Sequence, residues 1–204
     1  MTFWHHRQNF SLLLTIATIS FLFVYYGSLH PNGNFLATAG LDTMVQLWDL
    51  RKFGNHNGTL KKNNKSRLNS FFVGKSINSA FFSPSGRDLL TTTMANTCDI
   101  LTNFDIDTNM KAPSKRIRHD NLTGRWLSTF MARWHPTKED IFVVGSMNRP
   151  RMIDVFNSGT ASKVASVTGE SMTAVASRCC FHPSPNVDII MGGNSSGRVV
   201  IAQK

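Results

Sequence analysis

One short pattern occurs four times in the sequence: His or Ser, then Pro, a polar turn and an apolar run. The prolines of consecutive copies are 53, 52 and 47 residues apart. A proline placed just after a strand presets the following turn and removes no hydrogen-bond donor that the strand needs. The pattern therefore predicts repeated strand–turn–strand units. The four copies are His30–Gly40 (HPNGNFLATAG), Ser83–Thr93 (SPSGRDLLTTT), His135–Gly145 (HPTKEDIFVVG) and His182–Gly193 (HPSPNVDIIMGG).

Further apolar runs in each unit predict more strands, and no stretch shows a helical stripe. A period near 50 residues with three or four strands per unit is typical of propeller blades, which stack around a channel. We therefore predict an all-β fold, an incomplete β-propeller of about four blades. The alternative is an irregular β-sandwich with chance spacing. The expected strands are Phe35–Ala39, Val45–Trp48, Ile77–Phe82, Leu89–Thr93, Ile100–Phe104, Phe130–Trp134, Ile141–Gly145, Met152–Phe156, Val175–Phe181, Ile189–Gly193 and Val199–Ala202.

The composition excludes several classes of protein. With 41% hydrophobic and 17% charged residues among 204, the chain is no disordered polar tail, collagen-like fibre or polytopic membrane protein. Its net charge of +10 favours a polyanionic partner, either nucleic acid or an anionic membrane surface. Cys98, Cys179 and Cys180 form neither an even disulfide set nor a CxxC metal spacing. We therefore expect free thiols in a reducing compartment, and neither a metal nor a cofactor.

The amino-terminal segment differs from the rest. No charged residue lies between Gln8 and Leu41, and Phe10–Tyr26 is mostly apolar, although a membrane-spanning helix needs about 20 such residues. Three interpretations stay open: a signal or membrane anchor at Phe10–Tyr26, a strand within Phe21–Leu29, or a start that replaced the ancestral one. We divide the chain into an apolar leader, 1–27, and a partial propeller, 28–204. A membrane-anchored protein is the alternative to a nuclear one.

The first unit resembles a WD repeat, with small residues at Ala37–Gly40, a turn aspartate at Asp42 and the run VQLWDLR ending at Arg51. From His30 to its end, the sequence is similar to the damage-specific DNA-binding protein of nucleotide-excision repair. It is closer still to the WD repeat-containing protein 76 family of DNA-damage-response factors. The resemblance implies a nuclear, non-enzymatic WD-repeat scaffold that contacts DNA through loops on one rim. It rests on Leu36–Arg51, Ile77–Thr92, Ile117–Pro136, Phe142–Phe156 and Gly192–Gly197.

Basic residues gather after the second unit, next to Trp126. Neutralising phosphates needs clustered cations, and an aromatic side chain among them can stack on a base; a solvated basic loop is the alternative. The resemblance aligns Gly124–Trp126 with a wedge hairpin of the repair protein. The leading aromatic of that wedge is missing here, so the resemblance supports DNA affinity more than lesion flipping. The predicted DNA-binding residues are Lys115, Arg116, Arg118, His119, Arg125, Trp126, Arg149 and Arg151.

Two further groups of residues are candidates for contacts. Lys61, Lys62, Lys65 and Arg67 belong to a solvated loop between blades or contact phosphates. Trp48, Asp49 and Arg51 match the WDxR box of substrate receptors for cullin-4 ubiquitin ligases, in which the Arg helps dock onto the adaptor. A protein–protein scaffold of that kind is the alternative function. Alternatively, Trp48 is core and the residues after it form an ordinary turn.

The sequence predicts no enzyme. His30, His135 and His182 precede prolines at equivalent positions, which indicates a repeated structural role. No HExxH, GxSxG or P-loop motif is present. Gly192–Gly197 (GGNSSG) joins two expected strands with no helix after it, so it predicts a hairpin turn rather than a phosphate-binding loop.

Overall fold

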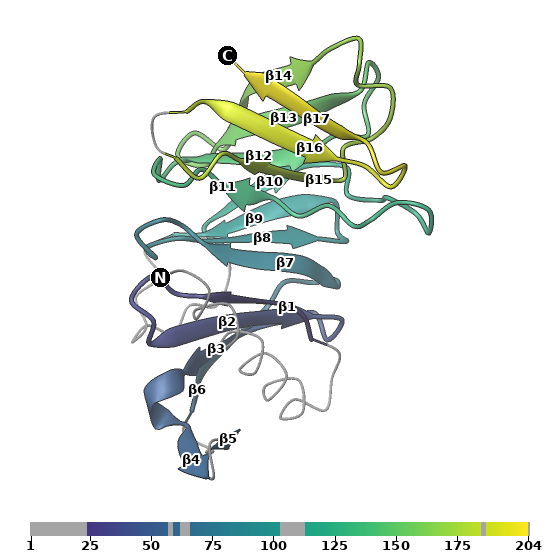
Figure 1. The fold of residues 1–204 in the computed structure, drawn as a ribbon. Helices are drawn as coiled ribbons and strands as arrows, with labels where there is room; N and C mark the ends of the chain where they lie inside the picture. Colours follow the sequence, from purple (N-terminus) through teal and green to yellow (C-terminus); the bar gives the residue numbers. More distant parts are fainter. Residues whose placement is uncertain (1–23, 57–58, 62–65, 103–112, 185–186, 204) are drawn as a thin grey trace.

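The computed structural model describes residues 24–56, 59–61, 66–102, 113–184 and 187–203. Figure 1 shows these residues as four antiparallel sheets that follow one another along the stack in chain order. The first three sheets have four strands and the last has three, while β4 and β5 form a separate hairpin beside the first sheet. The structure confirms the predicted all-β, partial propeller.

The strands have the following bounds. The first sheet contains β1 (Val24–Leu29), β2 (Phe35–Gly40), β3 (Met44–Asp49) and β6 (Arg67–Phe72). The second contains β7 (Ile77–Phe82), β8 (Leu89–Thr93), β9 (Thr97–Leu101) and β10 (Lys115–Arg118). The third contains β11 (Arg133–Trp134), β12 (Ile141–Gly145), β13 (Met152–Asn157) and β14 (Ser162–Thr168). The fourth contains β15 (Arg178–Phe181), β16 (Ile189–Gly193) and β17 (Val199–Gln203). The hairpin is β4 (Gly54–His56) and β5 (Thr59–Lys61), after a short 3-10 helix, η1 (Leu50–Lys52).

The same cross-strand positions carry the packing between successive sheets. In each sheet, one apolar pair on the second and third strands faces the next sheet along the chain. The first three of these pairs are buried, at 0–8% exposure, whereas the fourth is 44% and 67% exposed because no further sheet covers it among the described residues. Repetition of this register is what makes the sheets stack as blades. The four pairs are Ala37/Leu47, Leu90/Ile100, Val143/Val155 and Met191/Ile201.

The histidine of each His-Pro stretch caps the turn that follows it. The Nδ1 atoms of His30, His135 and His182 accept hydrogen bonds from the backbone N–H two residues later, at 3.1, 3.2 and 3.1 Å. In the second unit Ser83 takes the equivalent place, and its Oγ accepts from Asp88 N at 3.2 Å. These bonds satisfy turn donors that the strands leave unpaired. The structure therefore confirms the structural role that the repeat predicted for these histidines.

The predicted strands after the prolines have the predicted bounds to within one residue, and three others differ. The predicted strand Val175–Phe181 is shortened to β15, which begins at Arg178. The predicted strand Ile100–Phe104 is displaced toward the amino terminus, because β9 spans Thr97–Leu101. The predicted strand Phe130–Trp134 is reduced to β11, since only Arg133 and Trp134 pair with β12. Phe130 is fully buried all the same, so its apolar character reflects packing between blades rather than strand pairing.

The propeller begins before the predicted boundary at residue 28. β1 starts at Val24 and pairs with β2 as far as Leu29, so residues 24–27 belong to the first sheet. The strand interpretation of Phe21–Leu29 holds over that range. Residues 1–23, which contain most of Phe10–Tyr26, lie outside the described residues. Within the described ranges, no helix has both the length and the apolar character needed to cross a membrane.

Candidate nucleic-acid interface

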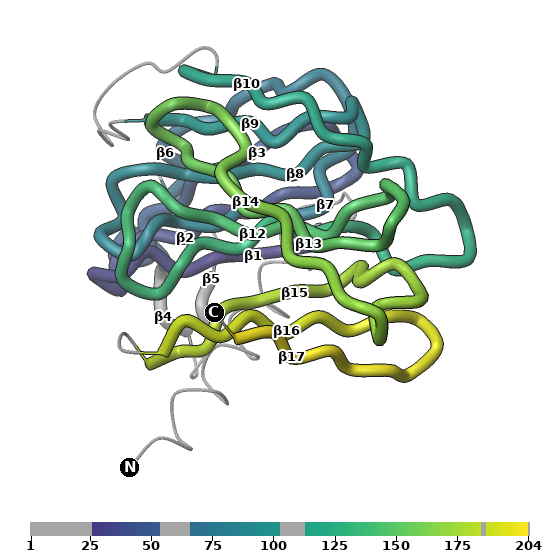
Figure 2. The backbone as a smooth tube through the Cα atoms, turned by 90° about the horizontal axis from the view of Figure 1, so that it is seen from above, coloured from purple at the N-terminus to yellow at the C-terminus, as the bar shows by residue number. Residues whose placement is uncertain are grey.

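The antiparallel topology sorts the loops onto two rims. Because neighbouring strands run in opposite directions, the turns between second and third strands emerge on the same side as the links from one sheet to the next. We call this side the linker rim; it consists of 41–43, 94–96, 146–151 and 194–198 together with the links 73–76, 119–132 and 169–177. Hydrogen bonds join turns and links: Val73 N donates to Thr43 O, and His119 N donates to Asn96 O, both at 3.0 Å. Figure 2 shows the β10–β11 link and the β16–β17 turn projecting from one edge.

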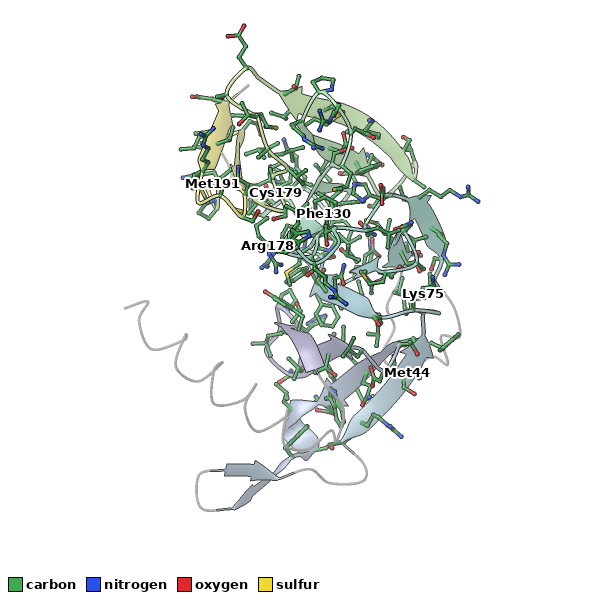
Figure 3. The ribbon with its side chains drawn as sticks, turned by 90° about the vertical axis from the view of Figure 1, so that its right-hand side faces the viewer. Met44, Lys75, Phe130, Arg178, Cys179 and Met191 are labelled. Carbon is green, nitrogen blue, oxygen red and sulfur yellow. The ribbon has the colours of Figure 1, made fainter. Side chains whose placement is uncertain are left out.

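The linker rim carries an excess of positive charge. Its described carboxylates are Asp42, Asp120 and Glu170, against five cations in its turns and links and a sixth, Arg118, which is the last residue of β10. Five of the six cations are exposed and Arg151 is half-buried. None of them forms an ion pair in the described part of the chain. The six are Lys75, Arg118, Arg125, Arg149, Arg151 and Arg198; Figure 3 shows Lys75 on the side that faces the reader.

Charged groups on the opposite rim are mostly paired. Glu139 accepts from Ser85 N at 2.7 Å and from Ser85 Oγ at 2.8 Å, which ties the second blade to the third. Lys138 Nζ lies 3.2 Å from Asp188, which ties the third blade to the fourth. Among the described residues of this rim, Lys52, Arg87 and Lys138 pair with carboxylates and Arg67 does not, so most of the described unpaired cations lie on the linker rim.

The β10–β11 link holds an aromatic side chain away from the core. Trp126 is 90% exposed, the highest value among the exposed large apolar side chains, and follows Gly124, whose positive φ of 65° suits glycine. The base of the link is fixed by Asn121, whose Nδ2 donates to the carbonyls of Thr93 (2.9 Å) and Thr97 (3.0 Å). A firmly anchored loop thus presents Trp126 and the adjacent Arg125 to solvent, as a stacking side chain requires.

Arg149 and Arg151 lie on the β12–β13 turn of the same rim. Arg149 is exposed, whereas Arg151 donates from Nη1 to Met147 O at 2.8 Å. Together with Arg118, Arg125 and Trp126, they are the five predicted residues that the fold brings to the linker rim with side chains that can reach a partner.

Three other predicted residues are used inside the protein. Lys115 Nζ donates to the carbonyls of Ser158 (3.1 Å) and Gly159, which fastens β10 to the third sheet. Arg116 forms two 3.0 Å bonds to the fully buried carboxylate of Asp99. Lys115 and Arg116 therefore belong to a strand rather than to the basic loop that the sequence suggested. His119 is 8% exposed, bonded through Nδ1 to Asn121 Oδ1 at 2.7 Å.

Replacing Arg116 should affect stability rather than DNA binding. Arg116→Ala leaves the buried Asp99 carboxylate without its bidentate partner. We expect a loss of about 1–2 kcal/mol in the free energy of unfolding, because the half-exposed guanidinium is partly screened. Urea titration measures this loss. Arg118→Ala, on the same strand but exposed, is the matched control and should leave the urea midpoint in place; an equal loss in both variants would contradict the assignment.

Burial of His119 should make folding sensitive to acid. Burial lowers the pKa of His119 from its usual 6.5, and the hydrogen bond to Asn121 opposes this only in part. The unfolded chain therefore binds the proton more readily. The stabilising contribution is complete above pH 6.5 and is lost as the pH falls below it. We expect the urea midpoint to decrease between pH 7.5 and 5.5, and to decrease less in His119→Gln. His182→Gln, at an exposed site, should keep the full decrease; if both variants respond alike, His119 is not the group responsible.

The three cysteines are free, and burial sets their chemistry. Cys98 and Cys179 are buried, and Cys180 is half-buried. Burial raises the pKa of the Cys98 thiol, and raises that of Cys179 to about 12, so both stay protonated at neutral pH. Among the described residues, no group of three or more His, Cys, Asp or Glu side chains is arranged to hold a metal ion.

Sequence reasoning missed two cations of the linker rim, Lys75 and Arg198. They lie 123 residues apart, each with few basic neighbours in sequence. Only the alternation of strand direction shows that both reach the same rim as Arg125. Conversely, Arg67 begins β6 near the opposite rim; Lys62 and Lys65 lie outside the described residues, and nothing is described of the Lys61 side chain.

The first blade has the internal hydrogen bonds of a WD unit. Asp42 in the β2–β3 turn accepts from Met44 N (3.3 Å) and Gln46 Nε2 (3.1 Å). Trp48 is 1% exposed and donates from Nε1 to Thr38 Oγ1 at 2.9 Å. The WD domain, G-beta repeat family matches residues 23–49, which are β1 to β3 with this Asp and Trp. The chain is a WD-repeat protein.

Three similar proteins extend this assignment beyond one blade. WD repeat-containing protein 76 of Mus musculus is 37% identical over 173 residues, covering 83% of this chain and 26% of the relative. The Xenopus laevis protein of the same name is 37% identical over 175 residues, 84% of this chain and 28% of the relative. DNA damage-binding protein CMR1 of Chaetomium globosum is 31% identical over 191 residues, covering 85% of this chain and 34% of the relative. The predicted resemblance is confirmed, and this WD-repeat protein spans about a quarter to a third of these relatives' lengths.

In this WD-repeat protein, the residues of the WDxR box bond to one another. Asp49 is buried and accepts from Arg51 N (3.0 Å), Nε (2.9 Å) and Nη2 (3.0 Å). These bonds lower the pKa of Asp49 and raise that of Arg51. The Arg51 side chain is nevertheless 59% exposed on the opposite rim, so one side of its guanidinium faces solvent.

Proposed function

We propose that this protein binds DNA through its linker rim, as a non-enzymatic WD-repeat scaffold of the DNA damage response that acts in the nucleus. The observation that carries the proposal is the distribution of charge. Six cations lie on one rim with no ion-pair partner among the described residues, while cations such as Lys138 on the opposite rim pair with carboxylates. A DNA duplex carries regularly spaced phosphates, and cations on one face of a protein bind these phosphates when no carboxylate of the protein neutralises them.

The side chains divide into two roles. Lys75, Arg118, Arg125 and Arg149 are exposed and would neutralise phosphates, releasing the counterions of the DNA. Trp126 is 90% exposed and lies between Arg125 and Arg149 in the sequence. Its side chain would stack on a base or wedge between base pairs. The names of the fungal relatives, DNA damage-binding proteins, support the same ligand for this chain.

The salt dependence of duplex binding tests the proposal. With up to six phosphates neutralised, the logarithm of the association constant should fall with the logarithm of salt concentration with a slope of about −5. Fluorescence anisotropy with a labelled 16-base-pair duplex, from about 50 to 300 mM salt, measures it. A slope near zero would show that the linker rim does not bind phosphates.

The second candidate function is that of a substrate receptor of a cullin-4-type ubiquitin ligase. The exposed guanidinium of Arg51 on the opposite rim favours it, because that rim stays free when DNA covers the linker rim. We expect Arg51→Ala to abolish capture of the ligase adaptor in a pull-down while DNA affinity changes less than twofold. Undiminished capture by the variant would exclude docking through Arg51.

A further inference from the structure

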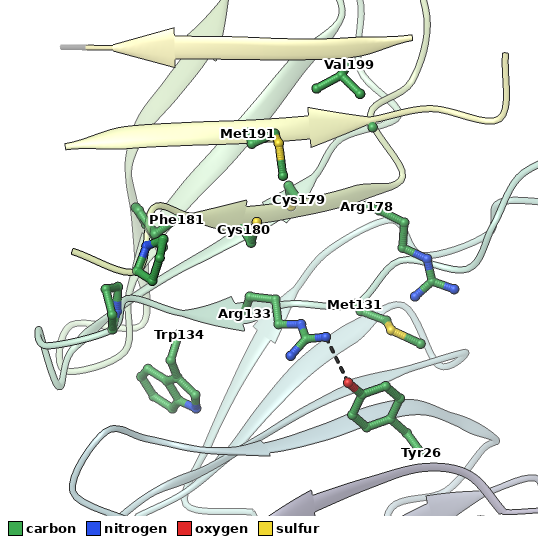
Figure 4. Close-up of a pocket in the computed structure, with 13 residues that line it drawn as sticks. Tyr26, Met131, Arg133, Trp134, Arg178, Cys179, Cys180, Phe181, Met191 and Val199 are labelled. Carbon is green, nitrogen blue, oxygen red and sulfur yellow. Dashed lines mark hydrogen bonds between the residues drawn. The ribbon is translucent and has the colours of Figure 1, made fainter. Parts of the chain in front are cut away.

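A cavity lies where the inner strands of three blades meet, and none of the proposed DNA-binding residues lines it. It has a volume of about 690 Å³, within the range of ligand pockets. Tyr26 of β1, Arg133 of β11 and Arg178 of β15 line it, and its apolar wall includes Met131, Phe181 and Met191 (Figure 4).

Arg133 is held in a fixed orientation inside this cavity. Its Nη2 donates to Tyr26 Oη at 2.8 Å, and its guanidinium carbon lies 3.8 Å from the centre of the Phe81 ring. The stacking on Phe81 and the hydrogen bond to Tyr26 leave the other N–H groups of the Arg133 guanidinium available to bind a ligand. No carboxylate pairs with Arg133 among the described residues, although the side chain is partly buried.

Arg178 places a second positive charge beside the first. Partial burial lowers the pKa of Arg178, and the nearby charge of Arg133 lowers it further. Figure 4 shows both guanidinium groups directed toward the side of the cavity where Met131 and Tyr26 lie. Arg133 is partly buried and Arg178 is exposed, and neither pairs with a carboxylate among the described residues. Two such guanidinium groups beside one cavity are an anion-binding arrangement, because an anion would offset their repulsion and accept hydrogen bonds from their free donors.

The cavity also exposes the edge of a strand. The four consecutive residues Arg178–Phe181 of β15 all line the cavity. Side chains of a strand alternate in direction, so four residues in a row can line the cavity only if the backbone edge of β15 faces it. β15 is the terminal strand of its sheet, so this edge has no strand partner within the sheet. An extended peptide can pair with a free edge through its main chain.

From these three observations we propose that the cavity binds an extended acidic peptide, whose carboxylate is held by Arg133 and Arg178 and whose neighbouring apolar side chain packs on Met131 and Met191. A peptide fits better than DNA, because phosphates of a duplex are met on open surfaces by solvated cations, whereas here one guanidinium lies within an apolar wall. The proposal does not rest on DNA binding, although Met131 belongs both to the cavity wall and to the 119–132 link of the linker rim.

Anisotropy with a labelled, acetylated octapeptide of alternating Asp and Leu tests the proposal on the full chain. We expect saturable binding, at least about tenfold weaker for the matched octapeptide of Asn and Leu. Arg133→Gln and Arg178→Gln should each weaken the Asp–Leu peptide by about tenfold or more. Arg149→Gln, outside the cavity, should leave peptide binding unchanged and weaken the 16-base-pair duplex instead.

Arg178 keeps the test decisive if Arg133→Gln fails to fold, because the exposed Arg178 side chain contributes no hydrogen bond to the described structure. Equal affinity for the Asp–Leu and Asn–Leu peptides would overturn the proposal. So would an Arg178→Gln variant that loses duplex binding but retains peptide binding, since Arg178 would then belong to the DNA interface. Failure of Arg149→Gln to weaken the duplex would count against the proposed function alone.

Discussion

Reversing three charges on the linker rim should reduce the affinity for duplex DNA by at least about a hundredfold at 50 mM salt. The variant carries Lys75→Glu, Arg125→Glu and Arg149→Glu, all at exposed residues without ion-pair partners in the described structure. Each lost phosphate contact removes about one unit from the salt slope, so the slope should change from about −5 to about −2. Anisotropy titrations at four salt concentrations measure both quantities.

The control changes the same number of charges on the opposite rim. Lys52→Glu, Arg67→Glu and Lys138→Glu give the protein the same net charge, and all three residues are exposed. If binding depends on where the cations lie, this variant should keep most of its affinity and a slope within one unit of the unmodified protein. Equal losses in the two triple variants would show that only the net charge matters, and the linker rim would lose its special role.

Replacing the buried Trp48 should strongly destabilise the protein, whereas replacing the exposed Trp126 should weaken only DNA binding. Trp48→Ala removes a side chain that is 1% exposed, packs with Leu36 and Phe53 and donates to Thr38. The cavity and the lost hydrogen bond should cost about 3–5 kcal/mol, a large part of the stability of a domain of this size. Urea unfolding followed by circular dichroism measures the loss.

Trp126→Ala is the matched substitution at an exposed site. At 90% exposure it should change the free energy of unfolding by less than about 0.5 kcal/mol. Loss of base stacking should weaken duplex binding by about five- to a hundredfold. A Trp126→Ala protein that binds DNA normally would show that the β10–β11 link contacts phosphates without inserting its aromatic side chain.

The first three strands after the prolines were predictable because both of their faces are buried. Leu89–Thr93 and Ile141–Gly145 are continuous apolar or small-residue runs between turn residues, and the structure confirms both. The outer strands were missed. Residues 115–118 (KRIR) and 162–168 (SKVASVT) face solvent on at least one side, so charge and polarity obscure the strand pattern.

The candidate site was predictable only where its cations are consecutive in sequence. The cluster around Arg118 and Arg125 was visible, but the sequence could not show that Lys115 is bonded to the β13–β14 turn and Arg116 to β9. Strand pairing decides this, because Arg116 lies opposite Asp99 in the β9–β10 register. Lys75 and Arg198 join the rim only through the stacking of blades, which no local pattern reveals.

Hydrogen exchange with and without duplex DNA tests most directly the claim that the linker rim is the DNA-binding surface. We predict slower exchange in residues 119–131 and 146–151 when a 16-base-pair duplex is bound at 50 mM salt. The turns of the opposite rim, 83–88 and 135–140, should exchange as in the free protein. Protection of those turns, with 119–131 unchanged, would contradict the account.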